Sequence, residues 1–338
     1  MSGSPSRNVQ LNFIQRLKDS LPASRSFVDE IADLLGVSAD SAYRRIRGET
    51  ALSLDEVAVL SAHFRIAPDL QSGSSSGNTV TFSYHHLSDN ALNFEQYLTN
   101  IANDMKRIKS ANQSEIIFAA EDIPIFHHFQ YPILTAFKLF YWNRSILNTP
   151  NLDGTKFDPA LINDNLMAQA RAIYDLYIET PSIEIWSEDT LNSTVKQVEY
   201  YWESGLFASK TDALNVLGDI EKMITGIERQ AAHSSKFKGD VPPADSSQNY
   251  TLYCSELMIG NNCILVRLGS NSVTFISYNT FNSMTTTSQS FNEETDRWLR
   301  NLIRKSIPIS GVAEKQRFRF FKMLNDKIVK MREKIEAE

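Results

Sequence analysis

Cysteine is scarce in this sequence: only Cys254 and Cys263 occur among 338 residues. They form no CxxC pair, and no histidine stands at the spacing that a zinc site requires. The cysteine content therefore argues against a structural zinc ion and against a disulfide framework, and it is typical of free or buried thiols in a reducing compartment. We expect no metal and no cofactor.

Long apolar runs are missing as well. No stretch approaches the ~20 apolar residues that cross a bilayer. The first residues also lack the apolar core of a signal peptide. We therefore expect a soluble, cytoplasmic protein without membrane association.

The chain has little excess charge of either sign. Its 34 lysines and arginines and 40 acidic residues give a formal net charge of −6 at pH 7. This charge is too small for an acidic tail and has the wrong sign for a general nucleic-acid coat. A basic surface that binds DNA must therefore be local.

Signatures of catalysis are absent from the sequence. It contains no P-loop, GxSxG, HExxH or glycine-rich dinucleotide fingerprint. The histidine pairs at 85–86 and 127–128 are poor metal sites, because neighbours on a helix or strand point to different faces. Glu121, Asp122 and His127 can form an acid–base cluster, but a turn beside hydrogen-bonded core histidines is more common. The sequence thus predicts a protein that is not an enzyme.

The most specific pattern lies in residues 26–65. Ser26 and Asp29 have the capping-box spacing that satisfies backbone donors at a helix start. Apolar side chains then recur at steps of three and four residues and predict one helix face: Phe27, Ile31, Leu34 and Leu35. Gly36 is expected to end this helix, because glycine readily adopts the left-handed conformation.

A second helix is predicted from Ala39 to Arg47, after Val37 in the turn and Ser38 as N-cap. Ala42 and Ile46 lie one turn apart and should face the first helix. The outer face then carries Asp40, Ser41, Tyr43, Arg44 and Arg47, with Arg45 near its flank.

This stretch resembles the helix-turn-helix of the Cro and lambda-repressor type, also called the xenobiotic-response-element family of bacterial regulators. The resemblance rests on Ile31-Ala32, Leu35-Gly36-Val37-Ser38, Arg47-Gly48 and the segment from Ser53 through Phe64. With a first helix at 8–21, it covers residues 8–70. Ala39 stands where many members carry a glutamine that contacts adenine, so the resemblance implies the docking mode but not the base sequence.

The resemblance implies that the second helix enters the major groove of double-stranded DNA. The candidate DNA-contacting residues are Ser38, Ala39, Asp40, Ser41, Tyr43, Arg44, Arg45 and Arg47. Arg44 and Arg47 are the best candidates for guanine or phosphate contacts, since the guanidinium fork suits either acceptor. Alternatively, these arginines form an ordinary solvated helix face. The first seventy residues hold about as many acids as bases, so we expect useful affinity to require a homodimer.

A serine- and glycine-rich tract at 71–78 is typical of a flexible linker, because it has no side chains to bury. We therefore predict a multidomain protein with an all-α helix-turn-helix domain over residues 1–70, a linker over 71–80 and an α+β, helix-rich region over 81–338. The loop with Pro242-Pro243 marks a candidate subdivision near 239–249.

Residues 92–108 carry a near-heptad apolar pattern: Leu92, Phe94, Leu98, Ile101, Met105 and Ile108. The pattern fits either a coiled-coil seam between subunits or an amphipathic helix packed on its own domain. We favour the packed helix, because about two and a half heptads are short for a coiled coil.

The remaining patterns predict alternating strands and helices. Strands are expected at 115–120, 182–186, 250–259, 263–268 and 273–278, and helices at 159–179, 190–202, 211–232, 293–303 and 313–335. Pro132 should start a very apolar helix, either deeply buried or at a subunit interface. Turn residues at 260–262 and 269–272 predict hairpins between the last three strands.

A polar loop is predicted at 278–290, where hydroxyl and amide side chains stand beside aromatics. Such a loop can line a pocket for a polar ligand, with Arg267, Arg297 or Arg300 as anion partners. A surface loop is the simpler interpretation.

The function that best fits these patterns is a sequence-specific transcription regulator, with a C-terminal region for dimerisation and for sensing an effector of unknown identity. The alternative is a protein-docking adaptor or toxin–antitoxin component whose C-terminal region is the active unit. Salt dependence separates the two, because binding to several phosphates weakens steeply with salt.

Overall fold

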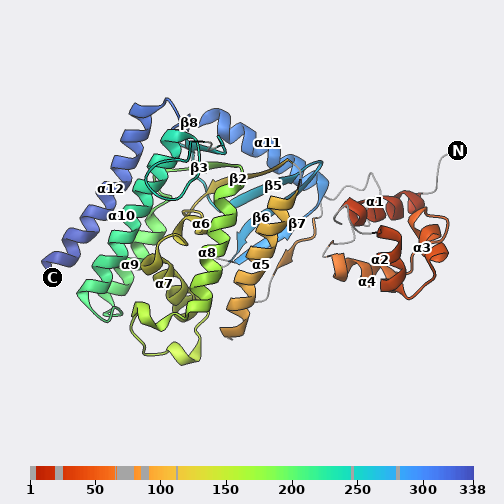
Figure 1. Ribbon diagram of the computed structural model, residues 1–338, viewed down its shortest axis with the longest axis horizontal. Helices are drawn as coiled ribbons and strands as arrows, with labels where there is room; N and C mark the ends of the chain where they lie inside the picture. The colour runs from red at the N-terminus through yellow and green to blue at the C-terminus, as the bar shows by residue number, and fades with distance from the viewer. Residues whose placement is uncertain are drawn as a thin grey trace. The chain divides into compact units, whose positions relative to one another are not determined.

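The computed structural model describes residues 5–19, 26–64, 66, 80–84, 91–111, 113–244, 247–278 and 282–338. The chain divides into two compact units, residues 1–83 with 285–292 and residues 84–284 with 293–338. Mixed α+β content is confirmed, because the described residues form twelve α-helices and an eight-stranded mixed sheet (Figure 1). The predicted linker at 71–78 and the histidine pair at 85–86 lie outside the described residues.

The described residues of the smaller unit up to position 66 form four helices: α1 (Pro5–Asp19), α2 (Phe27–Leu35), α3 (Ala39–Ile46) and α4 (Leu54–Phe64). Their apolar faces share one core of buried side chains: Phe13, Ile14, Leu17, Ile31, Ala32, Ala42, Leu60 and Ile66. The predicted inward orientation of Ala42 and Ile46 is confirmed, since Ala42 is fully buried and Ile46 packs against the same core. The outer face of α3 is consequently left to polar and charged residues.

The predicted turn between α2 and α3 is also confirmed. Gly36 has a φ of 63° in the left-handed region, where a side chain would strain the backbone. The Ser26 hydroxyl accepts a hydrogen bond from the Asp29 amide at 3.5 Å, and the Ser38 hydroxyl accepts one from the Ser41 amide at 3.3 Å. These local contacts set the start of each helix and the angle at which α3 leaves α2.

The sheet has the strand order β1-β7-β6-β5-β2-β3-β4-β8. Its strands are β1 (Ser83–Tyr84), β2 (Ser114–Ala120), β3 (Ser182–Trp186), β4 (Tyr250–Cys254), β5 (Cys263–Leu268), β6 (Asn271–Tyr278), β7 (Asn282–Thr286) and β8 (Ile307–Pro308). Strands β2, β3 and β4 run parallel, whereas β5 and β8 pair antiparallel with β2 and β4. Long connections join the parallel strands: the segment between β2 and β3 contains α6, α7 and α8, and the segment between β3 and β4 contains α9 and α10.

Except for residues 289–292 of α11, which belong to the smaller unit, the larger unit's described helices are α5 (Ala91–Ser110), α6 (Ile125–His128), α7 (Pro132–Tyr141), α8 (Asp164–Glu179), α9 (Asn192–Glu203), α10 (Lys210–His233), α11 (Gln289–Lys305) and α12 (Glu314–Ala337). Successive side chains of β2 point to opposite faces of the sheet, and different helices pack on each face. Ile116 and Phe118 join the large core with α5–α10 and α12, while Ile117 and Ala119 pack with Leu299 of α11. The sheet is therefore covered on both faces.

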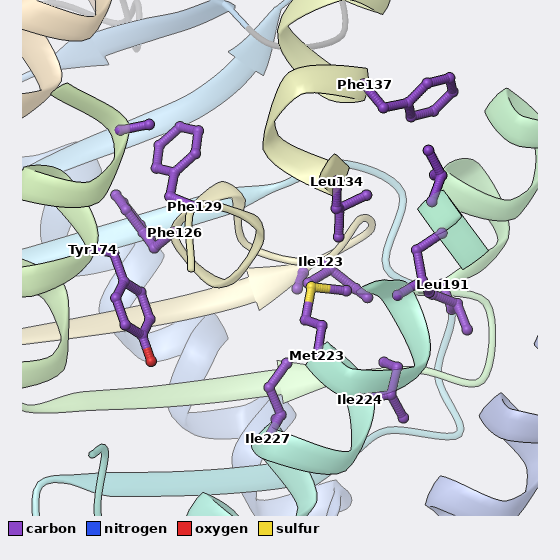
Figure 2. Close-up of a cluster of buried hydrophobic side chains, with 14 of the residues drawn as sticks. Ile123, Phe126, Phe129, Leu134, Phe137, Tyr174, Leu191, Met223, Ile224 and Ile227 are labelled. Atoms are coloured by element: carbon purple, nitrogen blue, oxygen red, sulfur yellow. The ribbon is translucent and has the colours of Figure 1, made fainter. Parts of the chain in front are cut away.

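Two predicted helices prove to be core elements of their own chain. In α5, Leu98, Met105 and Ile108 are buried against α8 and β2, which confirms the packed-helix interpretation; the side chains of Leu92 and Phe94 lie outside the described set. Helix α7 has Pro132 in its first turn, and every residue from 134 to 140 is buried. Figure 2 shows this core, in which α7 and α10 pack together.

The structure corrects three predicted segments. Helix α8 begins at Asp164, with Asn163 as N-cap, and 159–161 forms only a short 3-10 turn. The predicted strand 250–259 ends at Cys254. The polar loop at 278–290 is partly regular, because it contains β7 and the start of α11.

The predicted hairpin at 260–262 is wrong, whereas the hairpin at 269–272 is confirmed. Strands β4 and β5 are separated in the sheet by β2 and β3, while β5 and β6 are neighbours joined through Gly269 at a φ of 61°. Asn262 instead accepts hydrogen bonds from the backbone amides of Glu121 and Asp122, at 2.8 and 3.1 Å. The loop at 239–249 does not separate two sheets, because β3 and β4 on either side of it pair in parallel.

Candidate nucleic-acid interface

Helix α3 presents most of the candidate DNA-contacting side chains to solvent. The exposed ones are Ser38, Ala39, Asp40, Tyr43, Arg44 and Arg47, and the half-buried ones are Ser41 and Arg45. The large aromatic ring of Tyr43 is 49% exposed. Burial of Ala42 against α2 explains this arrangement, because it turns the helix face that holds Tyr43, Arg44 and Arg47 outward.

The exposed arginines pair with carboxylates close in sequence. Arg44 Nε lies 3.3 Å from Asp40 Oδ2, and Arg47 Nε lies 3.2 Å from Glu49 Oε1. The Arg47 guanidinium also lies 5.6 Å from the centre of the Tyr43 ring. Because all four charged side chains are at least 42% exposed, these ion pairs are weak. A phosphate or a guanine edge can therefore replace the carboxylates at little cost.

Arg45 has a different environment from the other two arginines. Its Nε and Nη2 lie 3.0 and 2.9 Å from Glu56 Oε1, and its Nη1 donates to the Ser41 hydroxyl at 2.6 Å. Glu56 and Ser53 also form a capping box, with bonds of 2.9 and 3.1 Å. Burial raises the pKa of Glu56, but the hydrogen bonds from Arg45 and Ser53 outweigh burial and lower it. The guanidinium of Arg45 thus fixes α3 to α4.

Gln10 of α1 holds the segment that follows α3. Its Nε2 donates to the carbonyl oxygens of Arg45 and Thr50, both at 2.8 Å, and its Oε1 accepts from the Leu52 amide at 3.0 Å. One amide side chain thereby satisfies three backbone groups and connects α1 to the exit of α3. Gln10 is not predictable from the sequence, because a polar residue on a helix carries no local sign of so distant a partner.

A second polar cluster, also missed from the sequence, lies in the larger unit around Glu184 of β3. This fully buried carboxylate accepts hydrogen bonds from Trp186 Nε1 at 2.8 Å, from Tyr250 Oη at 3.2 Å and from Tyr177 Oη. His127 Nε2 lies 2.9 Å away. Burial raises the pKa of Glu184, but the charge and hydrogen bonds of these neighbours outweigh it and lower the pKa. The only local sign of this cluster in the sequence is Glu184 itself, a single acid in an otherwise apolar strand.

Lys236 completes this buried cluster. Its Nζ donates to the carbonyl oxygen of Thr180 and to the Ser182 hydroxyl, and it lies 3.8 Å from the centre of the Tyr177 ring. Burial lowers the Lys236 pKa to about 7, although the charge of Glu184 opposes that shift. The carboxylate of Glu184 is already surrounded by donors, so the geometry is that of a structural hydrogen-bond network.

The structure does not assemble the acid–base cluster considered from the sequence. His127 contacts Glu184, whereas Asp122 Oδ1 accepts from the Ile123 amide at 2.9 Å and from the Thr194 hydroxyl at 3.3 Å. Glu121 lies near Asp122, and burial together with the Asp122 charge raises its pKa. These residues therefore belong to separate polar contacts.

Two of the three candidate anion partners share the carboxylate of Asp296. Arg267 pairs with Glu115 at 2.9 Å and with Asp296, and Arg300 pairs with Asp296 at 2.7 Å. Arg297 is exposed on α11. Two of the three guanidinium groups are thus already neutralised by acids of their own chain.

Cys254 and Cys263 are free thiols, and Cys263 is buried, in agreement with the expectation from the sequence. Among the residues that the structure describes, no group of three or more His, Cys, Asp or Glu side chains is arranged to hold a metal ion. In the same part of the chain, no helix is both long and apolar enough to cross a membrane.

Comparisons with models of protein families, with curated proteins and with solved structures found no significant match.

Proposed function

We propose that this protein is a sequence-specific transcription regulator and that α2 and α3 form its helix-turn-helix. One observation carries the proposal: α3 follows a left-handed glycine, is capped by Ser38, and exposes Tyr43, Arg44 and Arg47 on a single face. Helices of this kind place their first residues against base edges in the major groove. In this proposal the protein is a DNA-binding regulator and has no catalytic role.

Each exposed residue of α3 suits a different DNA contact. Arg44 and Arg47 can each donate two hydrogen bonds to guanine or to phosphate. Each good bidentate contact between an arginine and a guanine contributes about 1–3 kcal/mol of discrimination against the wrong base. Asp40, one turn before Arg44, can accept from the amino group of cytosine. Ser38 and Ala39 begin the helix, where small side chains allow close approach to the groove. Arg45, Glu56 and Gln10 hold α3 in place rather than contact DNA.

A monomer of this kind should bind weakly. The arginines of α3 stand beside Asp40 and Glu49, so much of the local positive charge is neutralised before DNA arrives. Two copies on a palindromic site would double the contacts, with half-sites about one helical turn, or ~34 Å, apart. The larger unit would then supply dimerisation and respond to an effector that biases one arrangement of the two helices.

The test is a pull-down of fragmented host DNA followed by sequencing. Wild-type protein should enrich a shared, roughly palindromic sequence, and the exposed double variant Arg44→Ala/Arg47→Ala should lose it. The matched control is Arg297→Ala/Arg304→Ala, which removes the same charge from exposed positions of α11. The control should retain enrichment.

Salt dependence gives a second criterion. The logarithm of the wild-type affinity should fall against the logarithm of salt concentration with a slope of about −0.9 for each phosphate contacted. Equal loss of binding in both double variants would indicate non-specific attraction. Absence of enrichment over the α3 variant at low and physiological salt would reject the proposal and favour a protein-docking role.

A further inference from the structure

Helix α12 uses only one of its faces inside its own chain. It runs along α10 at the outer side of the larger unit and also contacts α9 (Figure 1). The buried residues of α12 are Arg317, Phe320, Phe321, Leu324, Ile328, Met331 and Ile335. The opposite face of this 24-residue helix is exposed.

The exposed face carries a stripe of side chains at steps of three and four residues, which we call the α12 stripe. It consists of Lys315, Phe318, Lys322, Asp326, Val329 and Glu333, and all six are exposed. Phe318 is 61% and Val329 is 45% exposed. These two large apolar side chains stand about three helical turns apart on one face, and both are open to contact with another helix.

Other charged residues of α12 are occupied within the chain. Lys327 donates to Asn192 at 2.7 Å, Arg332 pairs with Glu221 at 2.8 Å, and Lys334 pairs with Glu199 at 2.8 Å. By contrast, within the described residues no hydrogen bond or ion pair engages the charged side chains of the α12 stripe. The stripe is thus a charged and apolar surface that no described part of this chain covers.

The charged and apolar residues of the stripe are arranged so that the stripe complements a second, antiparallel copy of itself. From the N-terminal end it reads positive, apolar, positive, negative, apolar, negative. In an antiparallel pair of identical helices, Lys315 faces Glu333 of the other copy, Phe318 faces Val329, and Lys322 faces Asp326. In a parallel pair each residue would face itself, so four rows of like charge would meet.

We propose that the α12 stripe binds the same stripe of a second copy, antiparallel, around a two-fold axis between Lys322 and Asp326. A two-fold interface requires a self-complementary surface, and the stripe has this property in both charge and apolar position. The proposal deepens the proposed function and rests on its expectation of a homodimer, for which it names the interface. A uniformly acidic or basic partner would meet repulsion along one half of the stripe.

Two flanking residues limit the strength of this pairing. Arg319 and Lys330 lie on the same edge of the stripe, and an antiparallel pair brings them near each other with like charge. The dimer should therefore dissociate on dilution. Reversal of one flanking charge, Arg319→Glu, creates two new opposite-charge pairs per dimer and should tighten it.

The experiment is analytical ultracentrifugation of the full chain without DNA, over a range of concentrations at low salt. Wild type should show a monomer–dimer equilibrium. Lys322→Glu and Asp326→Lys each turn two attractive pairs into repulsive ones and should raise the dimer Kd about tenfold or more. The double variant Lys322→Glu/Asp326→Lys restores both pairs and should return close to the wild-type Kd.

Mixing the two single variants provides the sharpest test. An equimolar mixture should form a heterodimer, because the acidic stripe of one chain then faces the basic stripe of the other. A folding defect would not be rescued by mixing, and circular dichroism should show unchanged helicity in each variant. Lys305→Glu, an exposed reversal on α11, should leave the Kd unchanged.

Several results would overturn the inference: a monomer at every concentration, a dimer that neither single variant weakens, or single variants that do not associate on mixing. The pull-down separates this failure from that of the proposed function. Binding to a palindromic site by a protein whose dimer ignores the stripe would reject only the interface. A stripe-dependent dimer without DNA enrichment would reject only the DNA-binding function.

Discussion

Arg45 Nη2 lies 2.9 Å from Glu56 Oε1, and this ion pair joins α3 to α4. Both side chains are largely buried, at 15% and 20% exposed, so the pair is shielded from solvent better than the ion pairs on the outer face of α3. The position of the helix proposed to enter DNA therefore depends on a residue that would not touch DNA.

Replacement of Glu56 by alanine should loosen α3. The change removes the capping-box carboxylate and leaves Arg45 without its partner, which should cost about 1–2 kcal/mol. Hydrogen exchange of the α3 and α4 amides should accelerate accordingly, by a factor of about ten. Asp55→Ala is the matched control, because Asp55 is an exposed acid in the same first turn. Equal exchange in the two variants would contradict this role for Glu56.

Acid should have a related effect on the smaller unit. The pKa of Glu56 lies below its ordinary value of 4.5 in the folded chain, so the folded state binds the proton less readily than the unfolded state. The stabilisation from Glu56 is thus present above about pH 4.5 and is lost as the pH falls through the lower, folded pKa. Hydrogen exchange corrected for intrinsic rates should show this acid loss in wild type but not in Glu56→Ala.

Lys236 should make the larger unit more stable in mild alkali. Burial lowers its pKa from 10.5 to about 7, so between these values the unfolded state binds the proton and the folded state does not. The free energy of unfolding should therefore rise with pH, by at most about 1.4 kcal/mol per pH unit. Denaturant titrations between pH 7 and 9, followed by tryptophan fluorescence, should show the rise in wild type.

Lys236→Met should reduce this rise, and Lys238→Met should preserve it, because the side chain of Lys238 is 53% exposed. The window stops at pH 9 because Tyr177 and Tyr250, whose pKa values burial raises well above 10, would act in the opposite direction in stronger alkali. Burial also raises the pKa of Cys254 and Cys263 to about 11, which opposes the rise near pH 9, so the decisive quantity is the difference between wild type and Lys236→Met. Equal slopes in these two proteins would show that Lys236 remains charged throughout.

His128 should be a destabilising residue. It is 2% exposed, and neither of its ring nitrogens has a hydrogen-bond partner among the described residues. A buried, unpaired polar group costs about 1–3 kcal/mol, so His128→Leu, of similar volume, should raise the free energy of unfolding at pH 7 by about 1 kcal/mol. Loss of stability in this variant would indicate that the ring nitrogens are hydrogen-bonded.

The same substitution should change the response to acid. Burial, followed by the nearby charges of Lys138 and His127, lowers the pKa of His128 well below 6.5. The unfolded state then binds a proton that the folded state excludes, so this group makes stability fall as the pH drops below about 6.5. His128→Leu should reduce that fall in denaturant titrations at pH 5 to 6.5.

The sequence by itself determined the features whose partners lie within one turn of the chain. The caps at Ser26 and Ser38, the left-handed Gly36 and the strand around Ile116 follow from backbone geometry and from the period of apolar residues. The exposure of Arg44 and Arg47 follows in the same way, because burial of Ala42 orients the rest of α3.

Only the tertiary structure decided which distant residues meet. Turn residues at 260–262 are equally suited to a hairpin and to a longer connection, and the packing of β2 and β3 between β4 and β5 selected the connection. Arg45 is distinguished from its neighbours by Glu56 in another helix, and Glu184 has partners on α6, α8 and β4. Local patterns are set by short-range backbone geometry, whereas these contacts arise only when separate elements bury their apolar faces together.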